Sequence, residues 1–317
     1  MTEERILTKI AELFYIYELS QLEIADKLGF SKAKISRLLK EAKQKKIIEF
    51  TIKSNFYEKR TLEFERRLEQ IYDLKEAIIY YDSDLMDQSD EIIFNEVGLA
   101  GANYVERMLS DGLNFALTWG KTLYHVIGKI KPKTKYPNAR VFSTLGGVSL
   151  TRAEYQNNNL TVMLAEKIGG TGYPVYLPLF LREPVKRELV EKEINIYEIL
   201  KSPSKIDYYI TGVGPISADS RLYIYSGVDL DFIQNIRDKG AVGEIGWNFY
   251  DKNGSFISTG IEDEIINLPV SEIRKMKTKV TIAFGKEKVE VLKAFLKTKI
   301  TNILITDSLT AQAILEN

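Results

Sequence analysis

Four short segments of the chain place glycine next to hydroxyl or basic side chains, each directly after an apolar run that predicts a β-strand. They are Thr118-Trp119-Gly120, Gly146-Gly147-Val148-Ser149, Gly212-Val213-Gly214 and Gly285-Lys286. Glycine permits close approach to the backbone, and a helix that follows it directs free N–H groups and a positive dipole end at an anion. One such glycine is more often part of an ordinary turn. Four at one sheet edge favour a site for a phosphorylated or carboxylated ligand.

Charged residues near these segments would complete the site. Arg152 and Lys288 lie within a few residues of two of them and would supply charge-assisted hydrogen bonds to the anion. Glu244 and Asp307 are acidic candidates for ligand hydroxyl groups, although Asp307 fits a helix cap equally well. The residues predicted to bind this ligand are Thr118, Trp119, Gly120, Thr144, Gly146, Gly147, Val148, Arg152, Gly212, Gly214, Glu244 and Lys288.

A second chemistry is concentrated between residues 31 and 60, which hold ten basic and three acidic side chains. The whole chain is formally neutral, with 44 Lys and Arg against 44 Asp and Glu. An arbitrary basic cluster is usually a solvated helix face. Here the local architecture favours DNA binding instead, because capping residues and a glycine turn place the cluster on the second helix of a helix-turn-helix.

The elements that position this cluster follow from the spacing of apolar and capping residues. Residues 3–17 predict an amphipathic helix whose buried stripe is Ile6, Leu7, Ile10, Leu13, Phe14 and Tyr17. Ser20 and Glu23 form a capping box that starts a short helix through Leu28, and Gly29 ends it. Ser31 caps a third helix, whose buried positions are Ile35, Leu38, Leu39 and Ala42. Ile47 to Ile52 alternates in part and resembles the strand or wing that follows many such units.

The outward residues of the third helix are predicted to contact DNA in the major groove. Arg37 is the first choice for reading a base, since a bidentate arginine on guanine contributes about 1–3 kcal/mol of discrimination. The lysines are expected to bind phosphate and to add salt-dependent affinity. The predicted DNA-binding residues are Ser20, Gln21, Ser31, Lys32, Ala33, Lys34, Ser36, Arg37 and Lys40.

The rest of the chain alternates short apolar runs with helical patterns, which predicts an α/β domain with a mostly parallel sheet. Residues 57–72 predict a charged connector helix or subunit contact with Leu62, Leu68 and Ile71 as its apolar positions. The stretch from Phe249 to Ile257 predicts a hairpin inserted into the sheet. The predicted strands are Ala77–Tyr80, Leu113–Thr118, Arg140–Leu145, Tyr208–Thr211, Val280–Phe284 and Asn302–Thr306.

The run from Leu19 to Leu39, LSQLEIADKLGFSKAKISRLL, resembles the DNA-binding segment of the SorC family of bacterial sugar-responsive transcription regulators. Four later stretches resemble signatures of that family's effector domain and follow in the expected order: Thr118–Leu123, Leu145–Gly147, Ala241–Ile245 and Ile303–Asp307. The resemblance implies a C-terminal domain similar in fold to sugar-phosphate isomerases. It further implies that this domain senses a sugar phosphate and governs operator binding.

Several other kinds of site are excluded by residue content. The chain has no cysteine and one histidine, His125, so disulfides and histidine-cluster metal sites are impossible. His125 itself is expected to be a packed or surface residue rather than a catalytic base. Gly120-Lys121-Thr122 mimics the end of a nucleotide-binding loop, but Phe115 occupies the place of the leading glycine. Gly212-Val213-Gly214 lacks the third glycine of a dinucleotide fingerprint. Leu145 provides no amine for an imine with an aldehyde sugar.

At 317 residues the chain is expected to form two domains: residues 1–55, an all-α helix-turn-helix of winged-helix type, and residues 56–317, the effector-binding and oligomerisation domain. The leading hypothesis is a cytoplasmic, non-enzymatic regulator of a sugar-metabolism operon. Its expected partners are double-stranded operator DNA, a phosphorylated sugar and one or three further copies of the chain, with no metal, no cofactor and no membrane. Two alternatives are a sugar-phosphate isomerase or deaminase with an accessory helix-turn-helix, and a nucleoid or scaffold protein without an effector.

Overall fold

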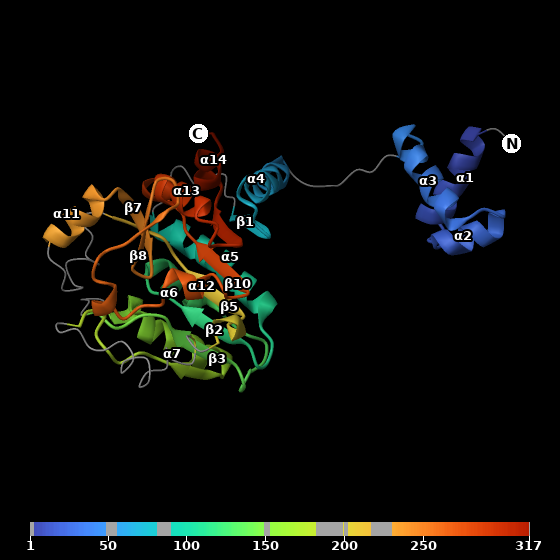
Figure 1. Cartoon of the computed structure of the whole chain (residues 1–317). Helices are drawn as coiled ribbons and strands as arrows, with labels where there is room; N and C mark the ends of the chain where they lie inside the picture. Colours follow the sequence, from blue (N-terminus) through green and yellow to red (C-terminus); the bar gives the residue numbers. More distant parts are fainter. Residues whose placement is uncertain are drawn as a thin grey trace. The chain divides into compact units, whose positions relative to one another are not determined.

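The computed structural model describes residues 3–48, 56–80, 90–148, 153–181, 199, 202–216 and 230–316. The chain separates into two compact units, Met1–Asn55 and Phe56–Asn317, which are treated separately below (Figure 1). Within the described ranges, no helix has both the length and the apolar character needed to cross a bilayer.

In its described residues, 3–48, the first unit has three helices: α1 (Glu3–Tyr15), α2 (Gln21–Leu28) and α3 (Lys32–Gln44). Helix α1 ends two residues before the predicted end, and Tyr17 is 67% exposed, so its expected place in the buried stripe is wrong. The reason is local, since Glu18 adopts a left-handed conformation with φ of 54° as the chain turns toward α2. The core of the unit is made by Leu7, Ile10, Leu13, Ile24, Ala25, Ile35, Leu38, Leu39 and Ala42.

The predicted caps of α2 and α3 are confirmed. The Glu23 N–H donates to Ser20 Oγ at 3.3 Å, and the Ser20 N–H donates to the Glu23 carboxylate at 2.8 Å. Gly29 ends α2 with φ of 68°, a left-handed value that favours glycine. The Lys34 N–H donates to Ser31 Oγ at 3.2 Å and fixes the start of α3. The predicted strand after α3 falls mostly on residues 49–52, outside the described residues, and Ile47 and Ile48 are not in a strand.

The second unit is built on a seven-stranded parallel sheet in the order β1-β11-β10-β5-β2-β3-β4. All six predicted strands belong to it. The seventh, β4, escaped prediction because it has three residues, contains Gly172 and lies at the sheet edge. The strands are β1 (Glu76–Tyr80), β2 (Asn114–Leu117), β3 (Arg140–Ser143), β4 (Thr171–Tyr173), β5 (Tyr208–Thr211), β10 (Thr278–Ile282) and β11 (Ile303–Asp307).

Helices cover both faces of this sheet, because successive strand residues point to opposite sides. In β11, Ile303 and Ile305 pack with α5 (Asp90–Met108), α6 (Lys121–Lys129) and α7 (Asn157–Ile168). Leu304 packs on the other face with α4 (Phe56–Tyr72), α13 (Val289–Lys297) and α14 (Ser308–Glu316). The predicted mostly parallel α/β architecture is confirmed (Figure 1).

A second, antiparallel sheet has the order β6-β7-β8-β9. It contains the predicted hairpin, but as part of this separate sheet rather than as an insertion into the parallel one, because β8 pairs with β7 and β9. Its strands are β6 (Gly214–Pro215), β7 (Ala241–Ile245), β8 (Asn248–Asp251) and β9 (Phe256–Ile257). The remaining elements are the helices α11 (Leu230–Asp238) and α12 (Val270–Ile273) and the 3-10 turns η2 (Ala153–Tyr155), η3 (Pro203–Lys205), η4 (Glu262–Glu264) and η5 (Lys286–Lys288).

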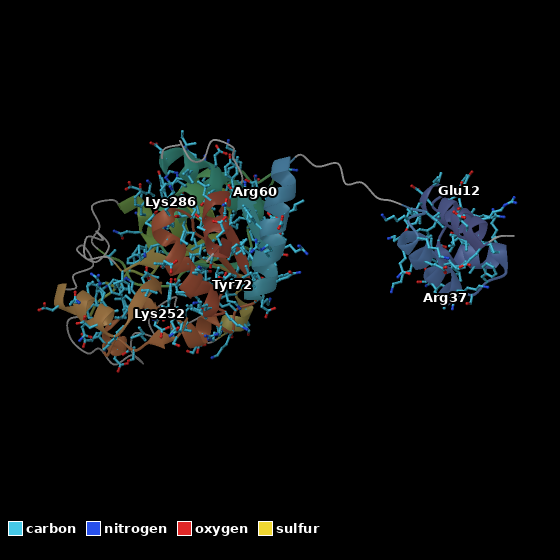
Figure 2. The ribbon with its side chains drawn as sticks, turned by 90° about the horizontal axis from the view of Figure 1, so that it is seen from above. Glu12, Arg37, Arg60, Tyr72, Lys252 and Lys286 are labelled. Atoms are coloured by element: carbon cyan, nitrogen blue, oxygen red, sulfur yellow. The ribbon has the colours of Figure 1, made fainter. Side chains whose placement is uncertain are left out.

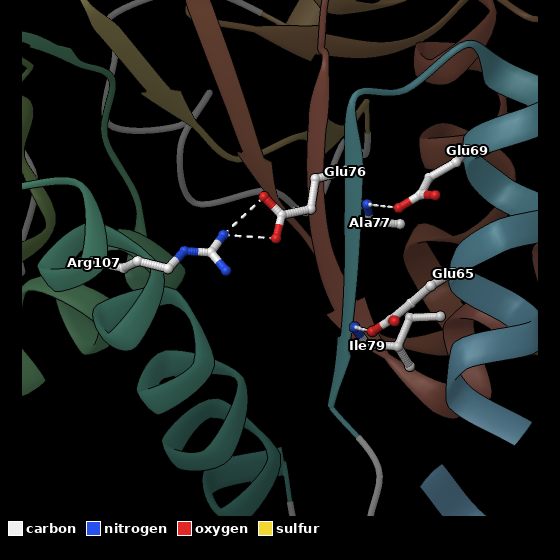
Figure 3. A network of polar contacts seen from close by, with 6 residues as sticks. All are labelled: Glu65, Glu69, Glu76, Ala77, Ile79 and Arg107. Atoms are coloured by element: carbon white, nitrogen blue, oxygen red, sulfur yellow. Dashed lines mark hydrogen bonds and ion pairs between the residues drawn. The ribbon is translucent and has the colours of Figure 1, made fainter. Parts of the chain in front are cut away.

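Helix α4 occupies the predicted range but not with the predicted apolar face. Leu68 is fully buried, whereas Leu62 is 55% and Ile71 is 59% exposed. Phe64, four residues before Leu68, supplies the other buried contact. The helix turns this face toward the sheet because Glu65 and Glu69, on the adjacent positions, accept backbone hydrogen bonds from strand β1 (Figure 3).

Candidate functional site

Helix α3 separates its apolar and polar residues into two faces. Ile35, Leu38, Leu39 and Ala42 are buried in the core of the first unit. The predicted DNA-binding residues on α3 are all exposed: Ser31, Lys32, Ala33, Lys34, Ser36, Arg37 and Lys40. Ser20 is also exposed and Gln21 is partly buried. Figure 2 shows Arg37 at the surface of the unit.

The cations of this unit differ in how they are held. The Lys34 ammonium lies 3.9 Å from the centre of the Phe30 ring. Lys45 pairs with Glu3 at 2.8 Å and with Glu41 at 2.7 Å, and the hydrogen bonds that its ammonium donates to these carboxylates raise its pKa. Among the described residues, the side chains of Lys32, Arg37 and Lys40 form no hydrogen bond or ion pair. Their charges are therefore available to an external anion.

Ser20 and Ser31 position the two helices rather than only facing outward. Each hydroxyl oxygen accepts a backbone N–H of the first helical turn, at 3.3 Å for Ser20 and 3.2 Å for Ser31. The hydroxyl proton of each serine remains available to a phosphate oxygen. A cap and a phosphate contact are compatible in the same side chain, since the two use different atoms.

The carboxyl ends of the parallel strands meet at one edge of the large sheet, where the glycine segments lie. Thr118, after β2, donates its hydroxyl to Thr211 Oγ1 at 3.1 Å, and Thr211 donates to the Gly212 carbonyl at 2.8 Å. Gly120 has φ of 121° and starts α6 without a side-chain cap. A Cβ added at Gly120 would meet nothing within 4 Å. Gly120 therefore has open space on the side where a side chain would stand, and the first turn of α6 has no side-chain cap for its backbone N–H groups.

The segment after β10 lies at the same edge. Gly285 has φ of 106°, and its N–H donates to Thr310 Oγ1 at 2.9 Å. Lys286 is exposed (Figure 2) and Lys288 is partly buried. The pKa of Lys288 is lowered, mainly by burial. The Glu287 and Glu244 carboxylates oppose this lowering, and the positive charge of Lys121 adds to it. Lys121, the first residue of α6, is therefore near enough to Lys288 for the two positive charges to repel each other.

Glu244 is 3% exposed and holds a turn. Its carboxylate accepts the Trp247 N–H at 2.9 Å, where Trp247 has a left-handed φ of 63°. A Cβ at Gly214 would lie 2.6 Å from Glu244 Oε1, so glycine makes room for this carboxylate. Burial raises the pKa of Glu244 to about 7 against the lowering by the Trp247 hydrogen bond and by Lys288. Glu244 is therefore poised to bind a proton near neutrality.

The structure uses several other predicted ligand-binding residues for packing. The Gly146 N–H donates to the Ile266 carbonyl and the Gly147 N–H to the Leu177 carbonyl, both at 2.8 Å. A Cβ at Gly146 would lie 2.5 Å from the Pro178 oxygen, so this glycine permits contact with protein backbone. Thr144 donates its hydroxyl to the Leu117 carbonyl at 2.8 Å. Trp119 and Val148 belong to a buried cluster around Trp247.

The predicted set thus divides. Thr118, Gly120, Gly212 and Lys288 follow strands of the parallel sheet, and Gly214 and Glu244 are paired in β6 and β7 of the antiparallel sheet. Thr144, Gly146, Gly147, Trp119 and Val148 support the loops around them. Arg152 lies outside the described residues. Lys121, the first residue of α6, was not among the predicted residues; it is exposed, and its ammonium lies 4.0 Å from the centre of the Phe94 ring.

Two ambiguous residues have structural explanations. Asp307 caps α14, accepting the Leu309 and Thr310 N–H groups at 2.9 Å. His125 packs against Phe94 and Tyr124, with ring centres 5.2 and 5.6 Å away, and burial together with Lys121 and Lys129 lowers its pKa. Over the described ranges, no group of three or more His, Asp or Glu side chains is arranged to hold a metal ion.

Comparison with known proteins gives consistent matches. Residues 58–316 match the family model described as "Putative sugar-binding domain". The sorbitol operon regulator of Klebsiella pneumoniae is 25% identical over 316 residues, covering 98% of each chain. The deoxyribonucleoside regulator of Bacillus subtilis (strain 168) is 28% identical over 318 residues, covering 99% of this chain and 98% of that protein. The crystal structure of the full-length Klebsiella sorbitol operon regulator matches with a TM-score of 0.73, over 98% of this chain and 99% of that one.

Proposed function

Since the chain belongs to the SorC family of sugar-binding transcriptional regulators, we propose that residues 1–55 bind operator DNA and that residues 56–317 bind a phosphorylated sugar that controls this binding. The resemblance in the segment Leu19–Leu39 is confirmed, and the protein is a transcriptional regulator. The relatives named for sorbitol and for deoxyribonucleosides support an operon of sugar metabolism as the target.

The observation that carries the DNA-binding proposal is the exposed cationic face of α3, whose Lys32, Arg37 and Lys40 side chains form no ion pair with described residues. Lys32, Arg37 and Lys40 are exposed, and they lie on a helix whose opposite face is fixed in the core. A recognition helix places such residues against base edges and phosphates in the major groove. Arg37 lies in the second turn of α3, from which a long side chain reaches the base edges. It is therefore assigned to base reading and the lysines to phosphate.

Footprinting of the promoter region upstream of the gene tests this assignment. We expect Arg37→Ala to lose the protected site, with a preference for it over other sequences reduced roughly tenfold or more. Lys32→Ala is the matched control: it should weaken specific and nonspecific binding alike and reduce the salt slope by about one. An Arg37→Ala footprint identical to that of the parent would refute the role of α3.

The effector proposal is supported by three features: the uncapped start of α6 after Gly120, the partly buried Lys288 after β10, and Glu244 of β7, whose pKa is about 7 and whose charge interacts with Lys288. Backbone N–H groups and a lysine suit a phosphate, and a carboxyl group suits a sugar hydroxyl. Among the predicted residues, Thr118, Gly120, Gly212, Gly214, Glu244 and Lys288 are proposed to form this site. Arg152 remains proposed from its position in the sequence.

A thermal-shift panel tests the effector site. We expect at least one hexose or pentose phosphate to raise the melting temperature, while inorganic phosphate and the unphosphorylated sugars raise it less. Lys288→Gln should diminish that rise, and Lys252→Gln, an exposed lysine on the β8–β9 turn (Figure 2), should preserve it. Equal shifts in the two variants would remove Lys288 from the site, and no shift with any compound would count against a sugar-phosphate effector.

The assembly is proposed to be a homodimer or homotetramer, because a palindromic operator requires two recognition helices about 34 Å apart, one DNA turn. The cytoplasm is proposed as its location. We infer that it acts without catalysis, without a cofactor and without a metal, and the regulator names of its relatives support this. Turnover of a hexose or pentose phosphate by the purified protein would overturn that inference in favour of an isomerase or deaminase.

A further inference from the structure

Strand β1 is the edge of the large sheet, and helix α4 covers its open side. Strand β1 pairs with β11 on one side only. On the other side, the Ala77 N–H donates to Glu69 Oε1 and the Ile79 N–H donates to Glu65 Oε1, both at 2.9 Å (Figure 3). The two glutamates are four residues apart and so lie on one face of the helix. They replace the neighbouring strand that the edge lacks, and they fix α4 along β1.

Helix α4 is also joined to the C-terminal helix α14. Arg60 donates to Gln312 Oε1 at 2.8 Å, and Arg67 donates to the Leu315 carbonyl at 3.4 Å. Phe64 and Leu68 of α4 share a buried cluster with Ala311 and Ile314 of α14. Polar and apolar contacts therefore hold α4 against residues 311–315 of α14.

The other end of α14 reaches the proposed effector edge. Asp307 is the last residue of β11 and caps the first turn of α14 through the Leu309 and Thr310 N–H groups. Thr310 donates its hydroxyl to Asp307 and accepts the Gly285 N–H at 2.9 Å. Gly285 opens the segment that carries Lys286 and Lys288. One nine-residue helix thus joins the loop after β10 to α4.

The start of α4 has a particular place in the chain. Phe56, its first residue, is the first residue of the second unit, directly after the unit that carries the basic helix. Arg60, which contacts α14, lies in the second turn of α4. A shift of α4 relative to α14 would therefore move the helix with which the second unit begins, directly after the DNA-binding unit in the chain.

We propose that α14 and α4 form one coupling element that connects the Gly285 loop to the start of α4, where the second unit follows the DNA-binding unit in the chain. Its use in regulation rests on the proposed function, but the mechanical coupling does not. Coupling between two sites requires an element whose conformational equilibrium is shifted by contacts at each of its two ends. Here the Gly285–Thr310 contact biases one end and the Arg60–Gln312 contact the other. By linkage, the coupling free energy between the two ends is the same whichever end is perturbed.

Hydrogen–deuterium exchange on the full-length protein, with neither DNA nor sugar present, tests the coupling. We expect Arg60→Ala to accelerate amide exchange in residues 283–290 by roughly threefold or more, since coupling energies along such elements are of order 0.5–2 kcal/mol. Arg66→Ala is the matched control, because Arg66 is exposed on the same helix. It should leave residues 283–290 unchanged.

The reverse perturbation completes the test. Thr310→Val removes the acceptor for the Gly285 N–H and should accelerate amide exchange in residues 60–72. Thr310→Ser retains the hydroxyl and should exchange at the rate of the parent protein. Acceleration confined to the mutated helix would overturn the proposal, as would equal acceleration in β2 and β3, which indicates general destabilisation. Because no DNA or sugar is used, failure here leaves the Arg37 and Lys288 experiments standing, and their failure leaves this result standing.

Discussion

The two units differ in how their functional residues are assembled. In the first unit, the caps, the turn and the basic face lie within the 25 residues from Ser20 to Gln44, and each depends on neighbours three or four positions away. In the second unit, the candidate residues come from segments far apart in the chain: Gly120 and Lys288 follow strands of the parallel sheet, whereas Gly214 and Glu244 are paired in the antiparallel sheet. A local site can be identified from residue spacing, whereas a dispersed site requires the topology.

The largest expected effect concerns two adjacent glycines of the second unit. Gly146→Val should destabilise the unit by roughly 3 kcal/mol or more, because the new side chain would collide with the backbone of Pro178 and Leu179. Gly147→Ala should cost less than about 1 kcal/mol, since the nearest atom to its Cβ would be 3.8 Å away. Chemical denaturation measures both. Similar losses in the two variants would mean that Gly146 is not a packing residue.

A pH-dependent effect is expected at Glu244. Its pKa is raised from 4.5 to about 7 in the folded protein, so the folded state holds the proton more tightly than the unfolded state. Stability from this group is therefore present below pH 4.5, decreases as pH rises toward 7 and changes little above that. The loss amounts to roughly 3 kcal/mol at most, at about 1.36 kcal/mol per pH unit.

Glu244→Gln isolates this contribution. The amide cannot ionise but its oxygen can still accept the Trp247 N–H. The stability of the variant relative to the parent should therefore rise between pH 5 and pH 7, on top of a constant cost of burying the amide. Thermal unfolding of both proteins across this range provides the measurement. A pH-independent difference would show that Glu244 titrates as an ordinary carboxyl.

A smaller effect is expected in the first unit. Ser31→Ala removes the cap of α3 and should cost about 1 kcal/mol, while Ser36→Ala, an exposed position inside the same helix, should be neutral or slightly stabilising. Urea unfolding of the two variants compares them directly. If both were equally neutral, the local signals would not determine the geometry of the recognition helix.

The sequence predicted most of the framework. Six apolar runs identified six of seven parallel strands, and Ser20, Glu23, Gly29 and Ser31 identified the helix ends, because these signals act over a few residues. Helix faces were less predictable. Leu62 and Ile71 are exposed because hydrogen bonding of Glu65 and Glu69 to β1 orients α4, a long-range contact that residue spacing does not contain.

The candidate ligand site was predicted in part for the same reason. Glycine after a strand indicates that something approaches closely, but not whether it is a ligand or the chain itself. At Gly120 the space is open, whereas at Gly146 it is filled by the Pro178 backbone. The two glycines have the same sequence signature, and only the fold distinguishes them. Asp307 likewise fitted either a ligand contact or a helix cap, and its hydrogen bonds to the Leu309 and Thr310 N–H groups identify it as the cap of α14.

The most direct test is the ratio of affinities of the intact protein for its own upstream promoter fragment and for a scrambled duplex, measured over a range of salt concentrations with and without sugar phosphates. We expect a preference of at least about 10³ for the promoter fragment, a steep decrease of both affinities with salt, and a change in the ratio with one sugar phosphate. Equal affinity for the two duplexes under every condition would contradict the assignment of α3 as a DNA-reading helix.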